Sequence, residues 1–247
     1  MAGYIWHMIH GYETYMQLSD ETKAKMPEDA LRSFMIGTIV PDLATGEQKK
    51  QTHFYKNHPV YGAQYEIPDI NRIKNLFLKK DPTYLGVLSH LKYDIDHIDR
   101  FLLVYAKPCG NNEYENTTTG EKMDGLTLWG NWKDVYGELY KLYDMYNMEM
   151  SKKYTTKLNE AFGTNFSADK KGFLAFVKWL FPENMPMSGI PEMDNYRTTD
   201  DINGILKGFF DNDGVDCKLS ADINDLIKIV KDSATELAKQ IDKLYAN

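Results

Sequence analysis

Three potential metal ligands lie along one short stretch of the chain, LSHLKYDIDH. His90, Asp94 and His97 are spaced four and three residues apart, so a helix would place all three side chains on one face. Imidazole nitrogens and carboxylate oxygens are ligands that zinc binds in tetrahedral sites. A helix with a solvated polar face would carry the same residues. This stretch alone therefore leaves a metal site and a solvated helix face both open.

Other candidate ligands lie earlier in the chain, and all six histidines fall within its first 97 residues. His7 and His10 are three residues apart, and His53 and His58 belong to the polar segment GEQKKQTHFYKNHP. Asp42 follows a proline at the expected end of a helix. A carboxylate there opposes the helix dipole, which a bound cation would compensate. A simple Pro-Asp turn is the alternative.

Four segments of the chain occur together in an order that is found in a known family. They are GYIWH, FMIGTIVPDL, KKQTHFY and GVLSHLKYD, at residues 3–7, 34–43, 49–55 and 86–94. They match an early His, then Gly-x-x-x-Pro-Asp, then Thr/Ser-His-Phe, then Gly-x-x-x-His-x-x-x-Asp. With these features, residues 1–105 resemble the bacterial zinc-dependent phospholipase C family, in its small intracellular branch. The resemblance implies an all-α bundle that holds zinc between helices and hydrolyses phosphodiesters.

The resemblance also assigns roles to the residues at matching positions. Asp42, His53, His90 and Asp94 would form one complete and tight Zn²⁺ site, and Asp42 would also be the catalytic general base. His7 would bind a second metal that Asp94 bridges to the first. The secreted enzymes complete this second site with the amine of a processed N-terminus, and we expect no such processing here. The resemblance thus implies one tight zinc site and leaves the second incomplete.

The third metal site of the family matches this chain least well. The secreted enzymes use a histidine soon after the His-x-x-x-Asp and a downstream His-x-x-x-Glu. Here His97 stands at a different offset, and the downstream helix offers Tyr140 and Asp144. Asp144 is a candidate metal ligand, whereas tyrosine replaces histidine poorly. We expect His10 to lie in the core or to orient a ligand, and His58, in a polar loop, to be exposed.

The segments that must position these residues have the apolar spacing of helices. We expect helices over residues 4–18, 27–40, 68–80, 82–102, 132–158, 168–181, 200–210 and 220–244. Asp81, Ser167 and Ser220 are the expected N-caps of three of them. Residues 109–125 are polar and rich in Gly, Asn and Thr, which predicts a loop. We expect no strand, so the predicted fold class is all-α, a multi-helix bundle.

Length and composition are those of an ordinary globular protein, with 247 residues, 43% hydrophobic and 26% charged. We expect a helical domain over residues 1–181 and a C-terminal helical extension over 182–247, packed on the same domain. The net charge of −7 argues against broad binding to nucleic acid or to an anionic membrane. No stretch has the roughly 18 apolar residues of a membrane span. We expect a cytoplasmic protein.

Three functions remain open at this stage. The first is a zinc phosphodiesterase of phospholipase C or nuclease type that acts on a phosphodiester or phospholipid, with Trp6 and Tyr55 in a substrate groove or simply in the core. The second is a non-catalytic helical protein with a structural metal site. The third is another metallophosphohydrolase marked by a His-Asp pair, although the chain has the reverse order, Asp96-His97. The sequence lacks the Gly-x-Ser-x-Gly of serine hydrolases and a phosphate-binding loop.

Overall fold

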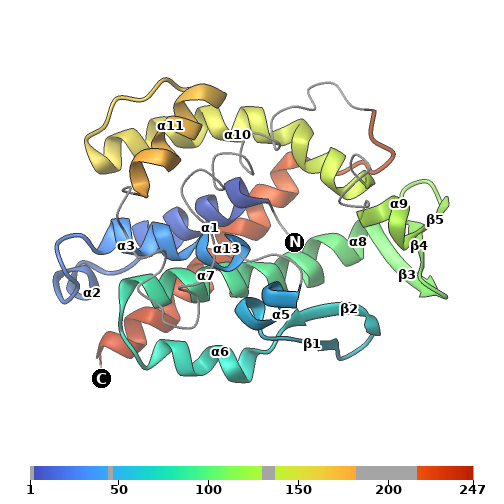
Figure 1. Cartoon of the computed structure of the whole chain (residues 1–247), viewed down its shortest axis with the longest axis horizontal. Coiled ribbons are helices and arrows are strands. Elements are labelled where there is room, and N and C mark those ends of the chain that lie inside the picture. Colours follow the sequence, from blue (N-terminus) through green and yellow to red (C-terminus); the bar gives the residue numbers. More distant parts are fainter. Residues whose placement is uncertain (1–2, 44–46, 130–136, 182–215, 247) are drawn as a thin grey trace.

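The computed structural model of the chain describes residues 3–43, 47–129, 137–181 and 216–246, which are mostly helical (Figure 1). The α-helices are α1 (Tyr4–Met16), α2 (Asp20–Ala24), α3 (Ala30–Gly37), α4 (Val40–Leu43), α5 (Glu47–His53), α6 (Ile70–Phe77), α7 (Pro82–His97), α8 (Leu103–Tyr105), α9 (Gly125–Trp129), α10 (Glu138–Phe162), α11 (Lys170–Leu180) and α13 (Ile223–Ala246). A π-helical turn, η1 (Ile98–Leu102), follows α7 directly. The strands are β1 (Tyr55–His58), β2 (Gly62–Pro68), β3 (Ala106–Gly110), β4 (Glu113–Asn116) and β5 (Lys122–Asp124).

Helix α7 lies in the centre of the molecule, and 13 of its 16 residues are buried. Its start follows the sequence prediction, since the Asp81 side chain accepts from the Thr83 N–H at 2.8 Å and Pro82 lies in the first turn. Helices α1, α3, α6 and α13 all pack against it. This one helix therefore positions its polar residues in the interior of the fold.

The contact between α3 and α7 depends on two glycines. A Cβ atom at Gly86 would lie 2.0 Å from the Phe34 carbonyl oxygen, and one at Gly37 would lie 2.1 Å from the Thr83 carbonyl oxygen. Both distances are far too short for a real side chain, so the helices approach as closely as they do only without those side chains. This approach brings the C-terminal end of α3 beside the turn of α7 that carries His90.

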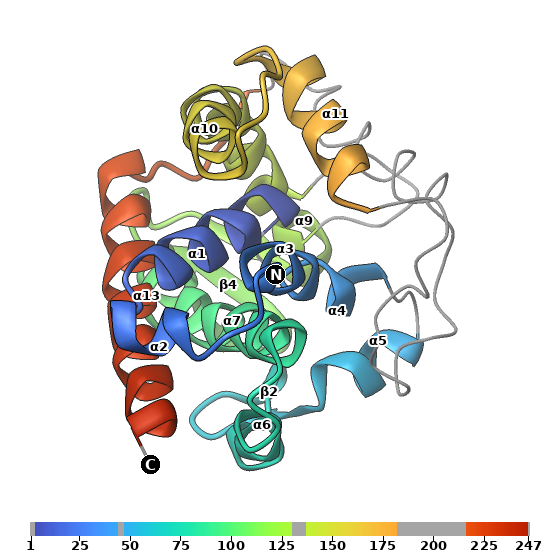
Figure 2. The same cartoon turned by 90° about the vertical axis from the view of Figure 1, so that its left-hand side faces the viewer.

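The C-terminal helix α13 packs along α1 and α7 (Figure 2). Its buried residues recur at helical spacing on one face, as the amphipathic pattern of the sequence predicts. The helix begins at Ile223, where the Asp222 side chain accepts from the Asn224 N–H at 2.8 Å, so Asp222 and not Ser220 caps the first turn. The start of the expected C-terminal extension at residue 182 and the expected helix at 200–210 lie outside the described residues.

The prediction of a loop over residues 109–125 is wrong, because most of this segment forms an antiparallel sheet of β3, β4 and β5. Tyr114 pairs with Pro108 on one side and with Met123 on the other, and its side chain is buried. Asn111 and Asn112 both have positive φ, at 51° and 58°, as a tight hairpin turn requires. The Gly and Asn residues that indicated a loop are thus the turns of a small sheet, and the described part of the chain is mostly helical with two small sheets.

A second departure from the prediction lies between α4 and α6. The polar segment that was expected to be a loop forms α5 and the hairpin of β1 and β2, in which Tyr55 pairs with Pro68. Helix α6 therefore begins later than expected, at Ile70, with Asp69 accepting from the Asn71 N–H at 3.1 Å. Strand β1, YKNH, is too short and polar to show the apolar alternation by which strands are recognised, whereas residues 63–67 of β2, AQYEI, do alternate, so a signal for that strand was present in the sequence.

Two other helices differ from their predicted limits. Helix α11 begins at Lys170, and its cap is Asp169, whose side chain accepts from the Gly172 N–H at 2.7 Å. The predicted cap, Ser167, instead donates its hydroxyl to Asp169 at 3.0 Å. Helix α10 runs from Glu138 to Phe162, four residues beyond the predicted end, where Gly163 adopts positive φ and ends it.

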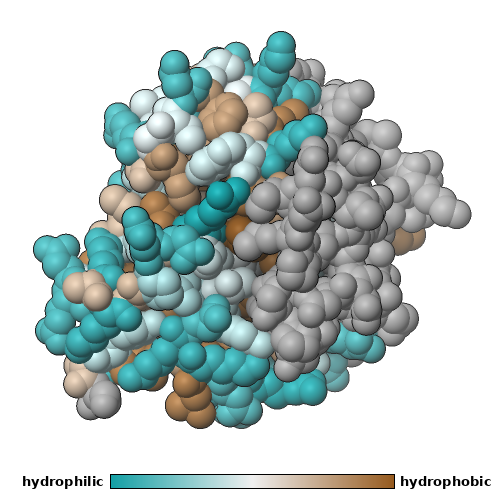
Figure 3. Space-filling model, turned by 60° about the vertical axis from the view of Figure 1, so that its left-hand side comes forward, coloured by the Kyte–Doolittle hydropathy of each residue, from teal (hydrophilic) through white to brown (hydrophobic). Residues whose placement is uncertain are grey.

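In the described part of the chain, no helix is both long enough and apolar enough to cross a membrane. Figure 3 shows one face, on which hydrophilic residues cover much of the coloured surface and apolar groups form small separate patches. Exposed apolar residues such as Val60 and Leu78 belong to different segments, a hairpin turn and the end of α6. Scattered exposed apolar side chains are normal for globular proteins.

Candidate metal centre

Five of the six predicted metal ligands meet in one buried cluster. His7 comes from α1, Asp42 from α4 and His53 from the last position of α5, whereas His90 and Asp94 come from neighbouring turns of α7. All five side chains are buried, and the most exposed of them, Asp42, is 6% exposed. Two groups have all their donor atoms within 4.8 Å of one another, and both include His90. This buried group could hold a metal ion.

Four of these side chains direct one atom each toward a common point. The Nε2 atoms of His53 and His90 lie 3.2 Å apart. Asp42 Oδ1 is 3.4 Å from His53 Nε2 and 3.9 Å from His90 Nε2. Asp94 Oδ2 is 3.6 Å from each of the same two nitrogens. Ligand atoms around a tetrahedral metal with bonds of about 2.0–2.1 Å are roughly 3.3–3.4 Å apart, and these five distances range from slightly below that spacing to about half an ångström above it.

The second nitrogen of each ring shows which way His53 and His90 are protonated. His90 Nδ1 lies 2.8 Å from the Thr38 carbonyl oxygen, which can only accept, so Nδ1 carries the proton. His53 Nδ1 lies 3.0 Å from Thr52 Oγ1, whose own proton goes to the Pro41 carbonyl at 2.9 Å. Both rings therefore present an Nε2 lone pair to the cluster, as in metal sites whose histidines are oriented by carbonyl or hydroxyl groups.

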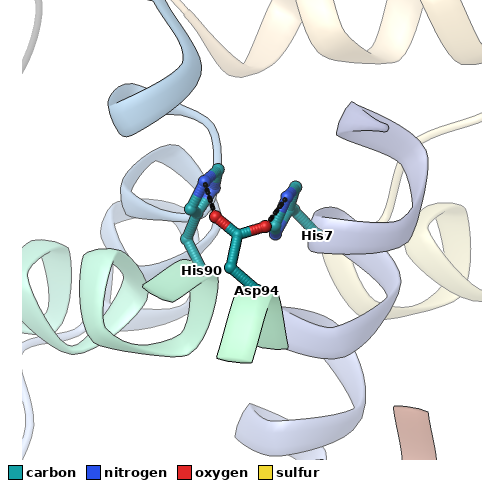
Figure 4. Close-up of side chains that lie close together, drawn as sticks. All are labelled: His7, His90 and Asp94. Atoms are coloured by element: carbon teal, nitrogen blue, oxygen red, sulfur yellow. Dashed lines mark ion pairs between the residues drawn. The ribbon is translucent and has the colours of Figure 1, made fainter. Parts of the chain in front are cut away.

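Asp94 lies between His7 and His90 and points one carboxylate oxygen at each (Figure 4). Its Oδ1 is 3.4 Å from His7 Nε2, and its Oδ2 is on the side of His90. The two oxygens of Asp42 also face different histidines, with Oδ2 3.9 Å from His7 Nε2 and Oδ1 near His53. The rings of His7 and His90 stack with centroids 3.5 Å apart. Each carboxylate thus faces His7 with one oxygen and the other histidines with its second.

Several atoms of the cluster are buried without a hydrogen bond. Within the described part of the chain, both ring nitrogens of His7 and both carboxylate oxygens of Asp94 have no hydrogen-bond partner. Buried polar atoms are normally satisfied, and each one left alone costs about 1–3 kcal/mol. A cation among these atoms would satisfy them together, which is the chemical reason to regard the cluster as a metal centre.

Burial and the neighbouring charges shift the pKa values of the cluster in different directions. Burial and the nearby His90 lower the pKa of His7 to about 4, so its ring is neutral at pH 7. Burial also lowers the pKa of His53, against the opposing effect of Asp42. Burial acts in the same direction on His90, but Asp42 and Asp94 outweigh it and raise its pKa. Burial would raise the pKa of Asp94, yet the histidines outweigh it and hold that pKa well below its usual value.

The residues proposed for a third metal do not join the cluster in the same way. Asp144 is buried on α10, where it accepts from Asn147 Nδ2 at 3.3 Å, and it belongs to neither group of clustered donors. His97 is buried against Tyr143, with which it hydrogen-bonds, and it also lies outside both groups. Tyr140 lies near enough to the cluster to feel its charges: burial, and then the charges of Asp42 and Asp94, raise its pKa to about 12. The role of Asp144 as a ligand stays a prediction.

Two other histidines have structural partners. His10 is buried, with Nδ1 2.7 Å from Ser89 Oγ and Nε2 2.9 Å from Ser233 Oγ, so it joins α1 to α7 and α13 as a core histidine would. The prediction that His58 is exposed is wrong. It is 5% exposed and its Nε2 lies 2.9 Å from Asp99 Oδ1.

Sequence reasoning missed the groups that orient the ligands. Thr52 stands in the Thr-His pair of the third motif, so a signal for it was present. The Thr38 carbonyl belongs to the backbone and leaves no trace in residue types. Of the two aromatic residues considered for a groove, Trp6 is fully buried, whereas Tyr55 is partly exposed and its ring lies 5.0 Å from that of His53.

Comparison of the chain with known protein families, with curated proteins and with solved structures finds no match.

Proposed function

We propose that the chain is a metal-dependent hydrolase, a zinc phosphodiesterase of the phospholipase C type. One observation supports this most strongly: two imidazole nitrogens from two helices each lie 3.4–3.9 Å from oxygens of the same two buried carboxylates and 3.2 Å from each other, close to the spacing of ligands around one zinc ion. The mixture of imidazole and carboxylate donors, without a thiolate, suits zinc or a similar divalent metal.

In this proposal Asp42, His53, His90 and Asp94 hold one Zn²⁺ tightly. His7 and the second oxygen of Asp94 hold a second ion less tightly, because fewer protein ligands face that side. Zinc supplies Lewis acidity that makes water nucleophilic near neutral pH and stabilises negative charge on phosphoryl oxygens. Two Zn²⁺ ions would outweigh the charges of the two carboxylates, so the pocket would attract an anionic phosphodiester.

Asp42 is the proposed general base. It is the most exposed member of the cluster, and its two oxygens face different histidines, Oδ1 toward His53 and Oδ2 toward His7. An oxygen that is not committed to the tight site can accept a proton from the attacking water. Thr38 and Thr52 hold the rings of His90 and His53 in the orientation that this arrangement needs.

A structural role for the metal is the second candidate, and the burial of the cluster favours it. The five side chains come from four helices that are separate in sequence. A metal that binds only the folded arrangement would stabilise it by mass action. In that case the chain would bind zinc and hydrolyse nothing.

Two measurements on the purified full chain test the proposal: zinc content by elemental analysis, and hydrolysis of a chromogenic phosphodiester. His90→Ala should lose both zinc and hydrolysis. His97→Gln is the matched control, since it changes a buried histidine of the same helix that lies outside the cluster. Zinc without hydrolysis of any phosphodiester tested would favour the structural role. A wild-type chain that retains no zinc would contradict both.

A further inference from the structure

The segments that carry His53 and Asp94 meet a second time, away from the cluster. His53 is followed by the hairpin of β1 and β2, and Asp94 is followed by the end of α7 and η1. Five residues beyond each of them stand His58 and Asp99. His58 Nε2 lies 2.9 Å from Asp99 Oδ1. We call this contact the clasp.

Hydrogen bonds within the hairpin show that His58 is the donor and Asp99 the acceptor of the clasp. His58 Nδ1 accepts the backbone N–H groups of Val60 at 3.1 Å and Tyr61 at 3.2 Å. A ring nitrogen that accepts carries no proton, so the proton is on Nε2, which donates to Asp99. The ring also packs against Tyr61, with centroids 5.2 Å apart. The turn therefore holds the imidazole with its donor directed at η1.

The segments 53–58 and 94–99 contact each other at both ends. At one end His58 meets Asp99, and at the other His53 Nε2 lies 3.6 Å from Asp94 Oδ2. The segment from Asp94 to Asp99 is continuous helix, α7 and then the π-helical turn η1, and π-helical turns often occur at functional sites. The segment from His53 to His58 enters a paired strand. This second segment is irregular, with Phe54 at φ 52° and a register shift between Asn57 and His58, but His58 is only five residues beyond His53, so the position of His58 limits where His53 can lie.

We propose that the clasp is a positioning pair that holds His53 against His90 and Asp94 and thereby sets the zinc affinity of the tight site. This inference rests on the metal centre of the proposed function, but it does not require that the centre be catalytic. The residue pair acts through His53 and touches no metal itself. Loss of the clasp leaves the helix that carries His90 and Asp94 in place and removes the contact between the hairpin turn and η1, while the packing of β2 on α7 remains.

The test is zinc affinity of the full chain by competition with a chromophoric chelator, in His58→Ala, Asp99→Ala and the double variant. Each single variant should bind zinc about tenfold more weakly, the lower end of the range for residues that orient ligands. The double variant should be no weaker than the singles, because both remove the same contact. Asp99→Asn keeps an oxygen that can accept from His58 and should restore most of the affinity.

Lys56→Ala is the matched control, because Lys56 pairs with Asp69 at 3.4 Å on the same hairpin and does not reach η1. Its zinc affinity should equal that of the wild type. Asp99 is 44% exposed, so its variants test the clasp without burying an altered group. Melting of the metal-free proteins separates general destabilisation from a change in affinity.

Three results would overturn the clasp. The first is unchanged zinc affinity in Asp99→Ala, and the second is an equal loss in Lys56→Ala. The third is a wild-type chain that binds no zinc, which removes the metal centre of the proposed function as well. Zinc binding without hydrolysis would remove only the proposed enzyme, and the predicted order of affinities would still establish the clasp.

Discussion

Helix α7 carries two residue pairs at the same spacing, and they balance their charge in different ways. His90 and Asp94 face the cluster, whereas Lys92 and Asp96 lie on another side of the helix, toward α13. Asp96 forms an ion pair with Lys92. Among the described residues, every ionic partner of Asp94 is a histidine. The same spacing thus gives a balanced ion pair on one side and, on the other, a buried carboxylate that a metal would balance.

The surroundings of each pair explain the difference. Asp96 is also 3.6 Å from Arg100 Nε, and Arg100 pairs with Glu236 of α13 at 2.9 Å. This second group contains permanent cations, so its charges are balanced whatever the solution contains. The cluster contains only imidazoles as cations, and burial keeps His7 neutral. A sequence motif of His-x-x-x-Asp therefore indicates a metal only when the fold keeps lysine and arginine away from the carboxylate.

The largest expected effect is the difference in zinc binding between two variants, each of which neutralises the carboxylate of one pair. Asp94→Asn removes the carboxylate whose oxygen lies nearest His7 Nε2, at 3.4 Å against 3.9 Å for Asp42, and which also faces His53 and His90, so zinc binding should weaken by more than about 100-fold. Asp96→Asn should leave zinc content unchanged, although the fold loses an ion pair. Elemental analysis after dialysis measures both. Full zinc occupancy in Asp94→Asn would show that the two carboxylates do not differ as described.

A second prediction separates the two sides of the cluster. His7→Ala should keep the tightly held zinc, because His53, His90 and both carboxylates remain. It should lose the rise in hydrolysis that added Zn²⁺ gives the wild type, because His7 belongs to the more weakly held ion. Zinc content and phosphodiester hydrolysis are measured with and without added metal. If His7→Ala loses all zinc, the cluster is one indivisible site.

A third, smaller effect concerns a carboxylate of α1 that has its own cation. Hydrogen bonds from Lys157 at 2.7 Å and Tyr154 at 2.7 Å hold the pKa of Glu13 below its usual value, although burial opposes them. This stabilisation is present above the ordinary glutamate pKa and is lost as pH falls through the lowered one. Glu13→Gln should cost about 1 kcal/mol at neutral pH. It should also flatten the dependence of stability on pH below about 4.5.

Denaturant unfolding of wild type and Glu13→Gln between neutral and acidic pH checks this prediction with and without zinc. The difference between the two proteins should shrink as pH falls. A difference that stays constant down to the most acidic pH would show that the carboxylate charge of Glu13 does not stabilise the contact between α1 and α10.

The smallest effect is expected at the partner of the second pair. Arg100 and Glu236 are 38% and 46% exposed, and exposed ion pairs contribute about 0–1 kcal/mol. Glu236→Ala should therefore change the free energy of unfolding by less than about 1 kcal/mol and should leave zinc content unchanged. Urea unfolding and elemental analysis measure the two quantities. A loss of zinc in this variant would mean that α13 controls the cluster.

Local signals account for what the sequence predicted well. The cap at Asp81 and the proline after it fix the start of α7, and the spacing of four then places His90 and Asp94 on one side of the helix. The order of four short motifs indicated that His7, Asp42 and His53 would join them, a convergence that periodicity alone does not contain. Apolar spacing likewise predicted α1, α3 and α13, because their buried faces repeat at helical intervals.

The features that were missed depend on contacts between distant segments. The strands β3, β4 and β5 are three to five residues long, too short and polar to show a pattern of period two. The residues around His58 are those of an exposed polar loop, and its partner Asp99 comes from η1, which is distant in the sequence. The Thr38 carbonyl reaches His90 because Gly37 and Gly86 let α3 approach α7. Such partners are determined by packing, which residue types in one segment do not reveal.

The most direct test of the central claim is to locate the metal in crystals of the purified chain by anomalous diffraction across the zinc absorption edge. We predict one strong zinc peak at about 2.0–2.1 Å from Nε2 of both His53 and His90, with Asp42 and Asp94 oxygens completing a tetrahedron. A weaker second peak beside His7 would mark the other side of the cluster. A strong zinc peak elsewhere, or zinc-soaked crystals in which Nε2 of His53 and His90 contact no metal, would contradict it.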